Sequence, residues 1–277
     1  NYSNQYYGPT PLRTGIEQSR NVMTVRLAQE VGMRVIAEYA ERFGVYDSMT
    51  AFLSAALGSE ETTLYRLVAA YAMFANGGER VEPTLVDRVQ DRYGDTIYRH
   101  DQRVCVECSD VTLEQGCGPR IASERERVMN AATAYQFTSM LEGLALPAPA
   151  RRPVMLPVPI AGKTGTSQVR RITQAERDAG VTRNEDLPWN RRDHALFVAF
   201  APADNPKYAI AVVVEHGGGG STAAAPIARD VMLQALYEGT PPLSAYPSAA
   251  RGQIADQQRR LNDLIRDIQP GRTTDEA

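Results

Sequence analysis

The first eighty residues repeat apolar positions with helical spacing. Apolar residues recur three and four positions apart in three segments, each followed by glycine, and this pattern predicts three helices. The sequence Thr14-Gly-Ile-Glu17 matches a capping box, so we expect a helix to begin there. The three helical stripes lie near 22–31, 35–43 and 62–74.

The pattern changes to that of β-strands near residue 159. Residues 159–169, 194–200 and 208–216 are predicted strands, and the turn 202–206 makes a hairpin of the last two. Both alternating faces of the second strand are apolar, so we expect other elements to cover both. One face carries Leu196, Val198 and Phe200, and the other carries Phe197 and Ala199.

Further helices are predicted on both sides of these strands. Residues 131–144 form one, a second begins near Pro226 because proline suits a first helical turn, and a third lies near 251–268. We expect a flexible glycine turn at 217–220, and short strands and loop at 81–125. Helices followed by an antiparallel sheet and a further helix define an α+β fold, with helices packed on a sheet.

The composition is that of an ordinary globular protein. The 277 residues are 43% hydrophobic and 23% charged, and the net charge of −3 gives no support for a nucleic-acid or membrane-surface partner. The longest apolar run, near 195–201, is far shorter than the roughly 20 residues of a membrane helix. Because the chain starts at Asn1 without methionine, we expect a piece of a longer protein.

Three cysteines lie close together after His100. Cys105 and Cys108 form a C-x2-C pair, and Cys117 follows. A zinc site with His100 is one interpretation, although the spacing matches no standard finger. A disulfide in a surface insertion, with one thiol left over, is the alternative in an oxidising compartment. On balance we expect no metal site.

Lys163 stands out in the sequence AGKTGTSQ. The chain has only two lysines against 28 arginines, and a compact ammonium can tune the proton affinity of a neighbour where a guanidinium cannot. Gly-Lys-Thr suggests a phosphate-binding loop. That loop needs glycine five positions earlier, where this chain has Pro157, so the nucleotide interpretation is weak.

Two short motifs give the lysine a better context. Lys163-Thr164-Gly165 lies on the first predicted strand, and Ser19-Arg20-Asn21 lies between two predicted helices. The set S-x-x-K, S-D-N and K-T-G marks penicillin-binding proteins and class A β-lactamases. The chain therefore resembles the penicillin-binding transpeptidases, with Ser-x-Asn in place of Ser-Asp-Asn.

Longer stretches make the resemblance more specific. Residues 1 to about 160 resemble bifunctional class A penicillin-binding proteins, through NYSNQYYGPTPLRTGIEQSRN and ALGSEETTLYRLVAAYAMFANGGERVEPTLVDRVQDRYG. Residues 161–240 resemble the monofunctional class B transpeptidases of cell elongation, through KTGTSQV and RDHALFVAFAPADNPKYAIAVVVEHGGGGSTAAAPIARDVM. Both halves imply the same reaction.

The resemblance implies a β-lactamase/transpeptidase-like fold, an antiparallel sheet covered by helices on both faces and incomplete at its N-terminal side. Residues 1–239 would be the C-terminal portion of a transpeptidase domain, and 240–277 a polar tail. Within the first part we expect a helical region with Ser-x-Asn (1–80), a loop insertion with the cysteines (81–125), and the K-T-G strand, hairpin and last helix (126–239).

The resemblance also implies roles for individual residues. Lys163 would face the carboxylate of a D-Ala-D-Ala peptide and adjust the proton affinity of Ser19. Thr164 and Thr166 would bond that carboxylate, and the Thr166 N–H would be one oxyanion-hole donor. Gly165 would keep the strand free of a side chain where substrate lies close.

Ser19 and Asn21 complete the implied site. Ser19 resembles the hydroxyl that relays a proton to the leaving amine. Asn21 would hold the amide of the acyl side chain and a lysine that this sequence lacks. Arg20 is expected to point elsewhere. Taken singly, Ser19 could instead be a helix cap, Asn21 a turn residue and Lys163 a solvated strand charge.

The nucleophile motif S-x-x-K is absent from the 277 residues. The resemblance places its helix, and two of five usual strands, ahead of Ser19. We therefore expect that this chain alone binds and acylates nothing efficiently, because removing one member of a catalytic unit costs nearly all its effect. A three-stranded sheet with an open edge should be marginally stable or prone to aggregate.

Three other functions remain open at this stage. A non-catalytic module would keep a peptide or β-lactam pocket without the serine. A serine β-lactamase would need a deacylating glutamate on its own loop, and no segment suggests one. A Ser-His-Asp hydrolase could use Asp193, His194 and His216, but no G-x-S-x-G elbow exists, and both histidines are expected to be structural.

The resemblance implies a peptidoglycan D,D-transpeptidase, an enzyme that cross-links stem peptides by serine acyl transfer and needs no cofactor. Its ligands would be D-Ala-D-Ala stem peptides and β-lactams, with no nucleic acid. It would act at the periplasmic face of the bacterial inner membrane, with its membrane anchor outside this chain.

Overall fold

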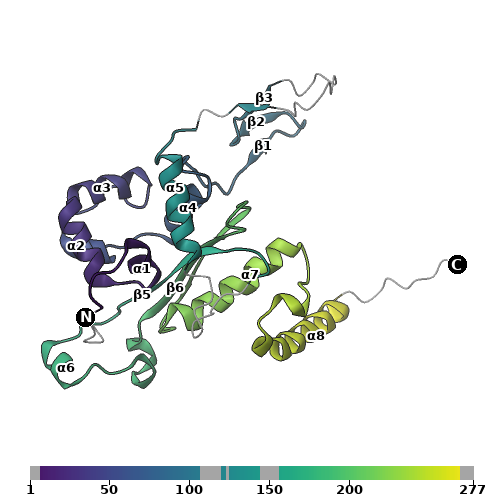
Figure 1. Ribbon diagram of the computed structural model, residues 1–277. Coiled ribbons are helices and arrows are strands. Elements are labelled where there is room, and N and C mark those ends of the chain that lie inside the picture. Colours follow the sequence, from purple (N-terminus) through teal and green to yellow (C-terminus); the bar gives the residue numbers. More distant parts are fainter. Residues whose placement is uncertain (1–6, 107–119, 123–124, 144–155, 269–277) are drawn as a thin grey trace. The chain divides into compact units, whose positions relative to one another are not determined.

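The computed structural model describes residues 7–106, 120–122, 125–143 and 156–268 (Figure 1). The chain divides into two compact units. We call residues 1–23 with 138–277 the sheet unit, and residues 24–137 the helical unit.

The sheet unit is built on three antiparallel strands. They are β5 (Ala161–Ser167), β6 (His194–Ala201) and β7 (Tyr208–Val214), in the order β5-β6-β7. All seven residues of β5 pair with β6, and Lys163 lies opposite Val198. The three predicted strands and the hairpin of the last two are thereby confirmed, within two residues at each end.

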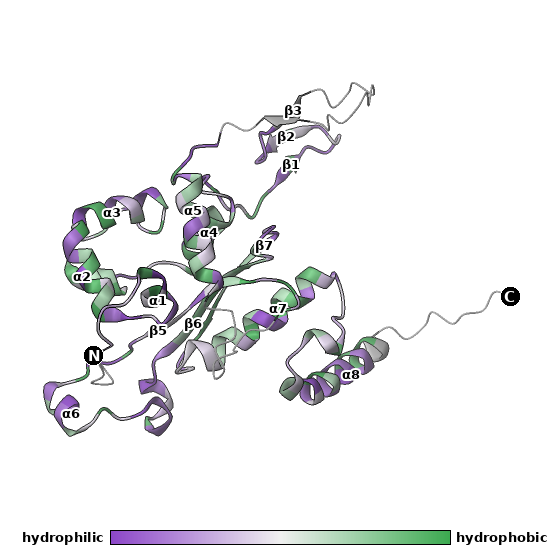
Figure 2. Ribbon diagram, viewed as in Figure 1, coloured by the Kyte–Doolittle hydropathy of each residue, from purple (hydrophilic) through white to green (hydrophobic). Residues whose placement is uncertain are grey.

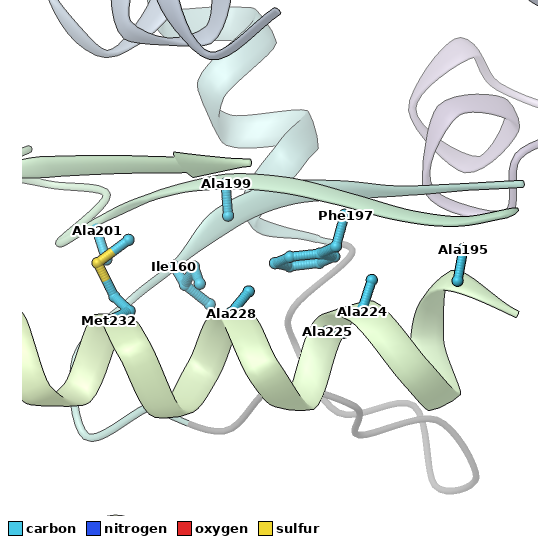
Figure 3. Close-up of a cluster of buried hydrophobic side chains, with 9 residues drawn as sticks. All are labelled: Ile160, Ala195, Phe197, Ala199, Ala201, Ala224, Ala225, Ala228 and Met232. Carbon is cyan, nitrogen blue, oxygen red and sulfur yellow. The ribbon is translucent and has the colours of Figure 1, made fainter. Parts of the chain in front are cut away.

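Both faces of β6 are buried, as its two apolar faces predict. Phe197 and Ala199 pack on α7 (Ala225–Tyr237), where small residues let the helix approach the strand closely (Figure 3). On the opposite face, Val198 is 6% exposed and Phe200 is fully buried. The helix contributes Ala225, Ala228 and Met232 to this cluster, and Ala224 directly before the helix also belongs to it.

The turn before α7 is packed more tightly than its glycine run suggests. Gly220–Ala224 forms a short π-helical segment (η4), and Pro226 occupies the first turn of α7 as predicted. A Cβ on Gly220 would lie 2.3 Å from the Leu196 carbonyl oxygen and 2.6 Å from that of Gly165. Gly220 is therefore required by the close approach of two strands, and not only for a flexible turn.

The rest of the sheet unit surrounds these strands. Helix α1 (Leu12–Glu17) contains both Thr14 and Glu17, so the predicted capping box is wrong: its residues lie inside the helix, and Pro11 holds the N-cap position without a side-chain bond. The β5–β6 connection carries α6, and the tail ends in α8. The remaining bounds are α6 Gln174–Ala179, η2 Asn184–Asp186, η3 Trp189–Arg191, η5 Leu243–Ala245, η6 Ser248–Ala250 and α8 Arg251–Ile268.

The polar tail is tied to the sheet unit through α8. Ile254 of this helix joins a buried cluster with Leu233, Ala245 and Tyr246. Hydrophilic and hydrophobic residues alternate along α8 in Figure 2, as expected of an amphipathic helix. Across the described part of the chain, no helix combines the length and apolar character needed to cross a membrane.

The helical unit has its own small core around Phe43, Ala70, Met73 and Val128. Its helices confirm the predicted stripes. Two short hairpins, β1 with β2 and β3 with β4, confirm the short strands expected after residue 81. The division at residues 23/24 and 137/138 falls within α2 and α5, so each of these helices has one end in the sheet unit. The bounds are α2 Asn21–Val31, α3 Met33–Arg42, η1 Leu53–Leu57, α4 Leu64–Ala75, β1 Arg88–Gln90, β2 Thr96–Arg99, β3 Val104–Val106, β4 Arg120–Ala122 and α5 Ala131–Glu142.

The cysteine hypotheses fall mostly outside the described residues. Cys105 lies on β3, whereas Cys108 and Cys117 are outside the described ranges. Among the residues that the structure describes, no group of three or more His, Cys, Asp or Glu side chains could hold a metal ion.

Candidate active site

Ser19 sits at the C-terminal end of α1 in a left-handed backbone conformation, with φ +52°. The Ser19 N–H donates to the Ile16 carbonyl at 3.1 Å, and the Arg20 N–H donates to the Gly15 carbonyl at 2.9 Å. This pair of bonds is a Schellman motif, whose left-handed position is usually glycine. Ser19 is therefore not an N-terminal helix cap, and a side chain is kept where glycine would fit with less strain.

Helix α1 is anchored within the sheet unit by Arg13. Its guanidinium donates to the Ser139 carbonyl at 2.7 Å and to the Ser139 hydroxyl at 3.0 Å. Ser139 belongs to the last turns of α5. This bond between residues far apart in sequence holds the first turn of α1, the helix whose other end carries Ser19. Sequence analysis missed this residue, because an exposed arginine in an arginine-rich chain carries no signal.

Lys163 meets Ser19 directly. The Lys163 ammonium donates to the Ser19 hydroxyl at 2.9 Å and to the Thr164 carbonyl at 3.0 Å. The side chain is largely buried, and this burial lowers the pKa of the Lys163 ammonium below its usual value. The two motifs found in the sequence are therefore brought together, and Lys163 is not a solvated strand charge.

The K-T-G segment is strand and not a phosphate-binding loop. All of it lies within β5, which is paired on one side only among the described strands. Exposure increases along the strand: Ala161 and Gly162 are buried, whereas Thr166 and Ser167 are exposed. The open edge next to Lys163 can therefore accept an extended ligand only toward its Thr166 end.

The remaining motif residues flank this edge. Thr164 lies opposite Phe197 and Thr166 opposite Ala195, so both share the face of β5 opposite to that of Lys163. A Cβ on Gly165 would come no closer than 3.4 Å to Leu196, so packing alone does not require glycine there.

Ser19 and Asn21 are separated by Arg20, whose side chain contacts Tyr7 and Gln18. Asn21 is the first residue of α2 and is exposed. The Arg20 guanidinium lies 3.3 Å from the centre of the Tyr7 ring and donates to the Gln18 side chain. This agrees with the expectation that the middle residue of Ser-x-Asn points elsewhere.

The histidines hold the end of the sheet. His194 Nδ1 accepts from the His216 backbone N–H at 2.9 Å. The Asp193 carboxylate accepts from the Asn184 amide at 3.0 Å, and from the Val169 N–H at 3.4 Å. Within the described residues these contacts give both groups structural roles and place no serine–histidine–aspartate relay here.

Comparisons with known proteins agree with this geometry. The family model for the penicillin-binding protein transpeptidase domain matches residues 1–233. Penicillin-binding protein 1A of Rickettsia bellii is 43% identical over 169 residues, 60% of this chain and 21% of that protein. Penicillin-binding protein 1A of Neisseria cinerea is 30% identical over 86% of this chain and 26% of its own length. The chain thus spans about a fifth to a quarter of these curated relatives.

Solved structures share the fold at lower identity. The PBPA crystal structure from Mycobacterium tuberculosis matches with a TM-score of 0.59 and 23% identity, covering 85% of this chain and 54% of that one. The D,D-transpeptidase domain of an Eggerthella lenta peptidoglycan glycosyltransferase gives 0.60 at 19% identity, over 86% and 56% of the two chains. These neighbours show that the chain has the β-lactamase-like fold of such transpeptidase domains.

The family model extends over most of the chain, and both motifs lie inside the matched range. The chain belongs to the penicillin-binding protein transpeptidase domain family. The expected α+β architecture and the expected family are both confirmed.

Proposed function

We propose that this chain is the C-terminal portion of a peptidoglycan D,D-transpeptidase domain, which cross-links stem peptides by serine acyl transfer. The observation that carries the proposal is the bond between Lys163 and Ser19, because it joins two motifs that lie 144 positions apart. Family membership supports the reaction class, and a related M. tuberculosis structure is a penicillin G acyl-enzyme complex.

Substrate binding would centre on β5. A D-Ala-D-Ala peptide ends in a carboxylate, which Lys163 can face and the Thr164 and Thr166 hydroxyls can bond. An ion pair at about 4 Å in an effective dielectric of about 20 is worth about 4 kcal/mol before desolvation. Gly165 leaves room for the peptide backbone at the open edge of the strand.

The chemistry would use a serine from an S-x-x-K motif outside these 277 residues. The lysine of that motif takes the proton of the serine hydroxyl as its oxygen attacks the carbonyl between the two D-alanines, and the Thr166 N–H stabilises the oxyanion. The C–N bond then breaks, and Ser19 relays a proton to the departing D-alanine amine. Lys163 supports that relay, because an ammonium with a lowered pKa gives up a proton more easily. An acceptor amine then attacks the ester and releases the serine.

Asn21 would bind the amide of the acyl chain and the lysine of S-x-x-K. Its place at the start of α2, two residues after Ser19, supports this role. We propose that the reaction takes place at the periplasmic face of the bacterial inner membrane, with the membrane anchor outside this chain.

Acylation by benzylpenicillin, read as intact mass, tests the proposal. The 277-residue chain should gain no penicilloyl mass. A hybrid in which the S-x-x-K segment of the R. bellii protein precedes this chain should gain one, and Lys163→Ala in the hybrid should remove it. A penicilloyl group on the chain alone would show that one of its own serines is the nucleophile.

One further candidate shares the fold and the contact between Lys163 and Ser19 but not the catalysis. A non-catalytic module of the same fold would bind peptide or β-lactam without acylation. The hybrid experiment separates the two functions, because a chain that has lost its catalytic geometry would stay unacylated even with the serine restored.

A further inference from the structure

A pocket opens where β5 ends. It has a volume of about 450 Å³, and Gln168, the residue directly after the strand, forms part of its wall. The other walls come from the segment that leads into α6 and from α6 itself. This segment lies within the sheet unit, and Figure 1 shows it leaving the end of β5 toward α6. The lining residues are Gln168, Arg171, Ile172, Thr173, Gln174 and Arg177.

Two arginines give this pocket a positive charge. Neither Arg171 nor Arg177 forms an ion pair with any side chain in the described part of the chain, and both are exposed. Asp178, the neighbouring acid, accepts instead from the Gln174 amide at 2.8 Å. The pocket therefore carries two guanidinium groups whose donors are available to a ligand.

A third arginine holds the segment in shape. The Arg170 guanidinium makes two bonds to the Glu176 carboxylate, at 2.7 and 2.6 Å, and Arg170 and Glu176 are both mostly buried. This contact holds the pKa of the Glu176 carboxyl below its usual value, so the acid is charged and already neutralised by its partner. Thr173 caps α6 by accepting from the Glu176 N–H. Glu176 is thus already paired with Arg170. Arg171 and Arg177 lie on a segment that this ion pair stabilises.

The position of the pocket matches the path of an extended peptide on β5. With its C-terminal carboxylate beside Lys163 and Thr166, such a peptide can continue only toward Ser167, because the other end of the strand is buried. An extended chain rises about 3.3 Å per residue. Gln168 is two residues beyond Thr166, so the pocket wall begins about 7 Å farther along. A branch two or three residues before the D-Ala-D-Ala end would reach it.

We propose that Arg171 and Arg177 form a carboxylate subsite, which selects peptides that carry a free acidic branch two or three residues before D-Ala-D-Ala. Guanidinium groups bind carboxylates bidentately, and such charge-assisted bonds are about twice as strong as neutral ones. The subsite rests on the proposed function, because it needs the peptide to lie along β5.

Peptide binding to the hybrid that carries the S-x-x-K segment, with its motif serine replaced by alanine so that no acylation follows, tests the subsite, and NMR titration gives the dissociation constants. The probes are N-acetyl-γ-D-glutamyl-L-lysyl-D-alanyl-D-alanine and the same peptide with the glutamate α-carboxylate converted to an amide. The acidic peptide should bind about tenfold more tightly. The double variant Arg171→Gln/Arg177→Gln should bind both peptides equally, at the affinity of the amide.

Two control variants separate this proposal from the proposed function. Arg183→Gln changes an arginine of the same connection that already pairs with Glu185 and Asp186, and it should keep the tenfold preference. Lys163→Ala should weaken both peptides alike, because it removes the charge that faces their shared C-terminus.

The outcomes are distinguishable. If the hybrid with both arginines intact binds both peptides with equal affinity, and Lys163→Ala weakens that binding, the subsite is overturned and the proposed function stands. A preference that survives in the double variant also overturns it. If neither peptide shifts the NMR signals of the β5 residues, both the proposed function and the subsite that rests on it are overturned.

Discussion

Strands β5 and β6 are paired along the whole of β5, yet they are built for different purposes. Almost every residue of β6 is buried, and its side chains fill the cores on both faces of the sheet. Strand β5 carries glycine, lysine and threonine, and it becomes exposed toward Ser167. The buried strand β6 supports the fold. Its pairing holds β5 rigid, and β5 carries the Lys163 charge, two threonine hydroxyls and an open edge.

If β6 supports the fold and β5 carries the site, the largest loss of stability is expected from a substitution in β6. Phe200 is fully buried, so Phe200→Ala should lower the free energy of unfolding by about 3–5 kcal/mol, through lost burial and a residual cavity. Urea denaturation followed by circular dichroism measures the loss. If this variant does not fold, Phe200→Leu should still show a loss of about 1 kcal/mol.

The matched control is Leu264→Ala on α8, whose side chain is 57% exposed and should change stability by less than about 0.5 kcal/mol. Similar losses in the two variants would mean that β6 is not the core of the unit.

Two glycines of β5 divide the strand into a structural and a functional part. A Cβ on Gly162 would lie 2.6 Å from Ala199 Cβ and 2.7 Å from the Val198 carbonyl oxygen, so Gly162→Ala should destabilise by about 1–3 kcal/mol. Gly165→Ala meets only ordinary contacts and should stay within about 0.5 kcal/mol. Peptide titration should nevertheless show weaker binding to Gly165→Ala, because the methyl group would stand on the same face of β5 as the Lys163 side chain, next to the proposed carboxylate site.

Equal stability losses for Gly162→Ala and Gly165→Ala would contradict the assignment of a structural role to Gly162 and a functional role to Gly165. A Gly165→Ala chain that binds D-Ala-D-Ala peptide as well as the unaltered chain would remove the functional reason for this glycine.

The same contrast explains what the sequence could predict. Strand β6 was recognisable because burial on both faces leaves a run of apolar residues, and the helices because their apolar stripes recur with helical spacing. Family resemblance named Lys163 and Ser19, but only the fold shows that they touch. No periodicity encodes a contact between residues 144 positions apart.

The failures have physical causes as well. Thr14 and Glu17 have the spacing of a capping box, but α1 begins at Leu12 and encloses them, so the local pattern did not fix the helix start. Gly220 must be glycine because the carbonyl oxygens of Leu196 and Gly165, which are remote in sequence, leave no room for a Cβ. Arg13 is one of 28 arginines and gains its meaning only from its bond to Ser139.

A smaller effect is expected from the charge of Lys163. Burial lowers its pKa in the folded state below the unfolded value, so the unfolded chain binds more protons and stability rises with pH through that window. Lys163→Met removes the titrating group. Its stability relative to the unaltered chain should therefore be highest near neutral pH and should decline as pH rises toward the ordinary lysine pKa.

Urea midpoints of both chains at neutral and alkaline pH measure this difference. Tyrosines titrate in both chains alike and cancel in the comparison. A difference that stays constant with pH would show that the Lys163 ammonium is not penalised by burial.

The smallest expected change concerns the backbone of Ser19. Its φ of +52° is adopted by glycine at little cost, so Ser19→Gly should stabilise the chain by about 0.5–1 kcal/mol relative to Ser19→Ala. Both variants lose the hydroxyl that accepts from Lys163, so their difference isolates the backbone. In the hybrid with S-x-x-K, both should lose proton relay, and acylation by benzylpenicillin should slow equally. Slower acylation of Ser19→Ala alone would instead make the left-handed turn, and not the hydroxyl, the functional feature at this position.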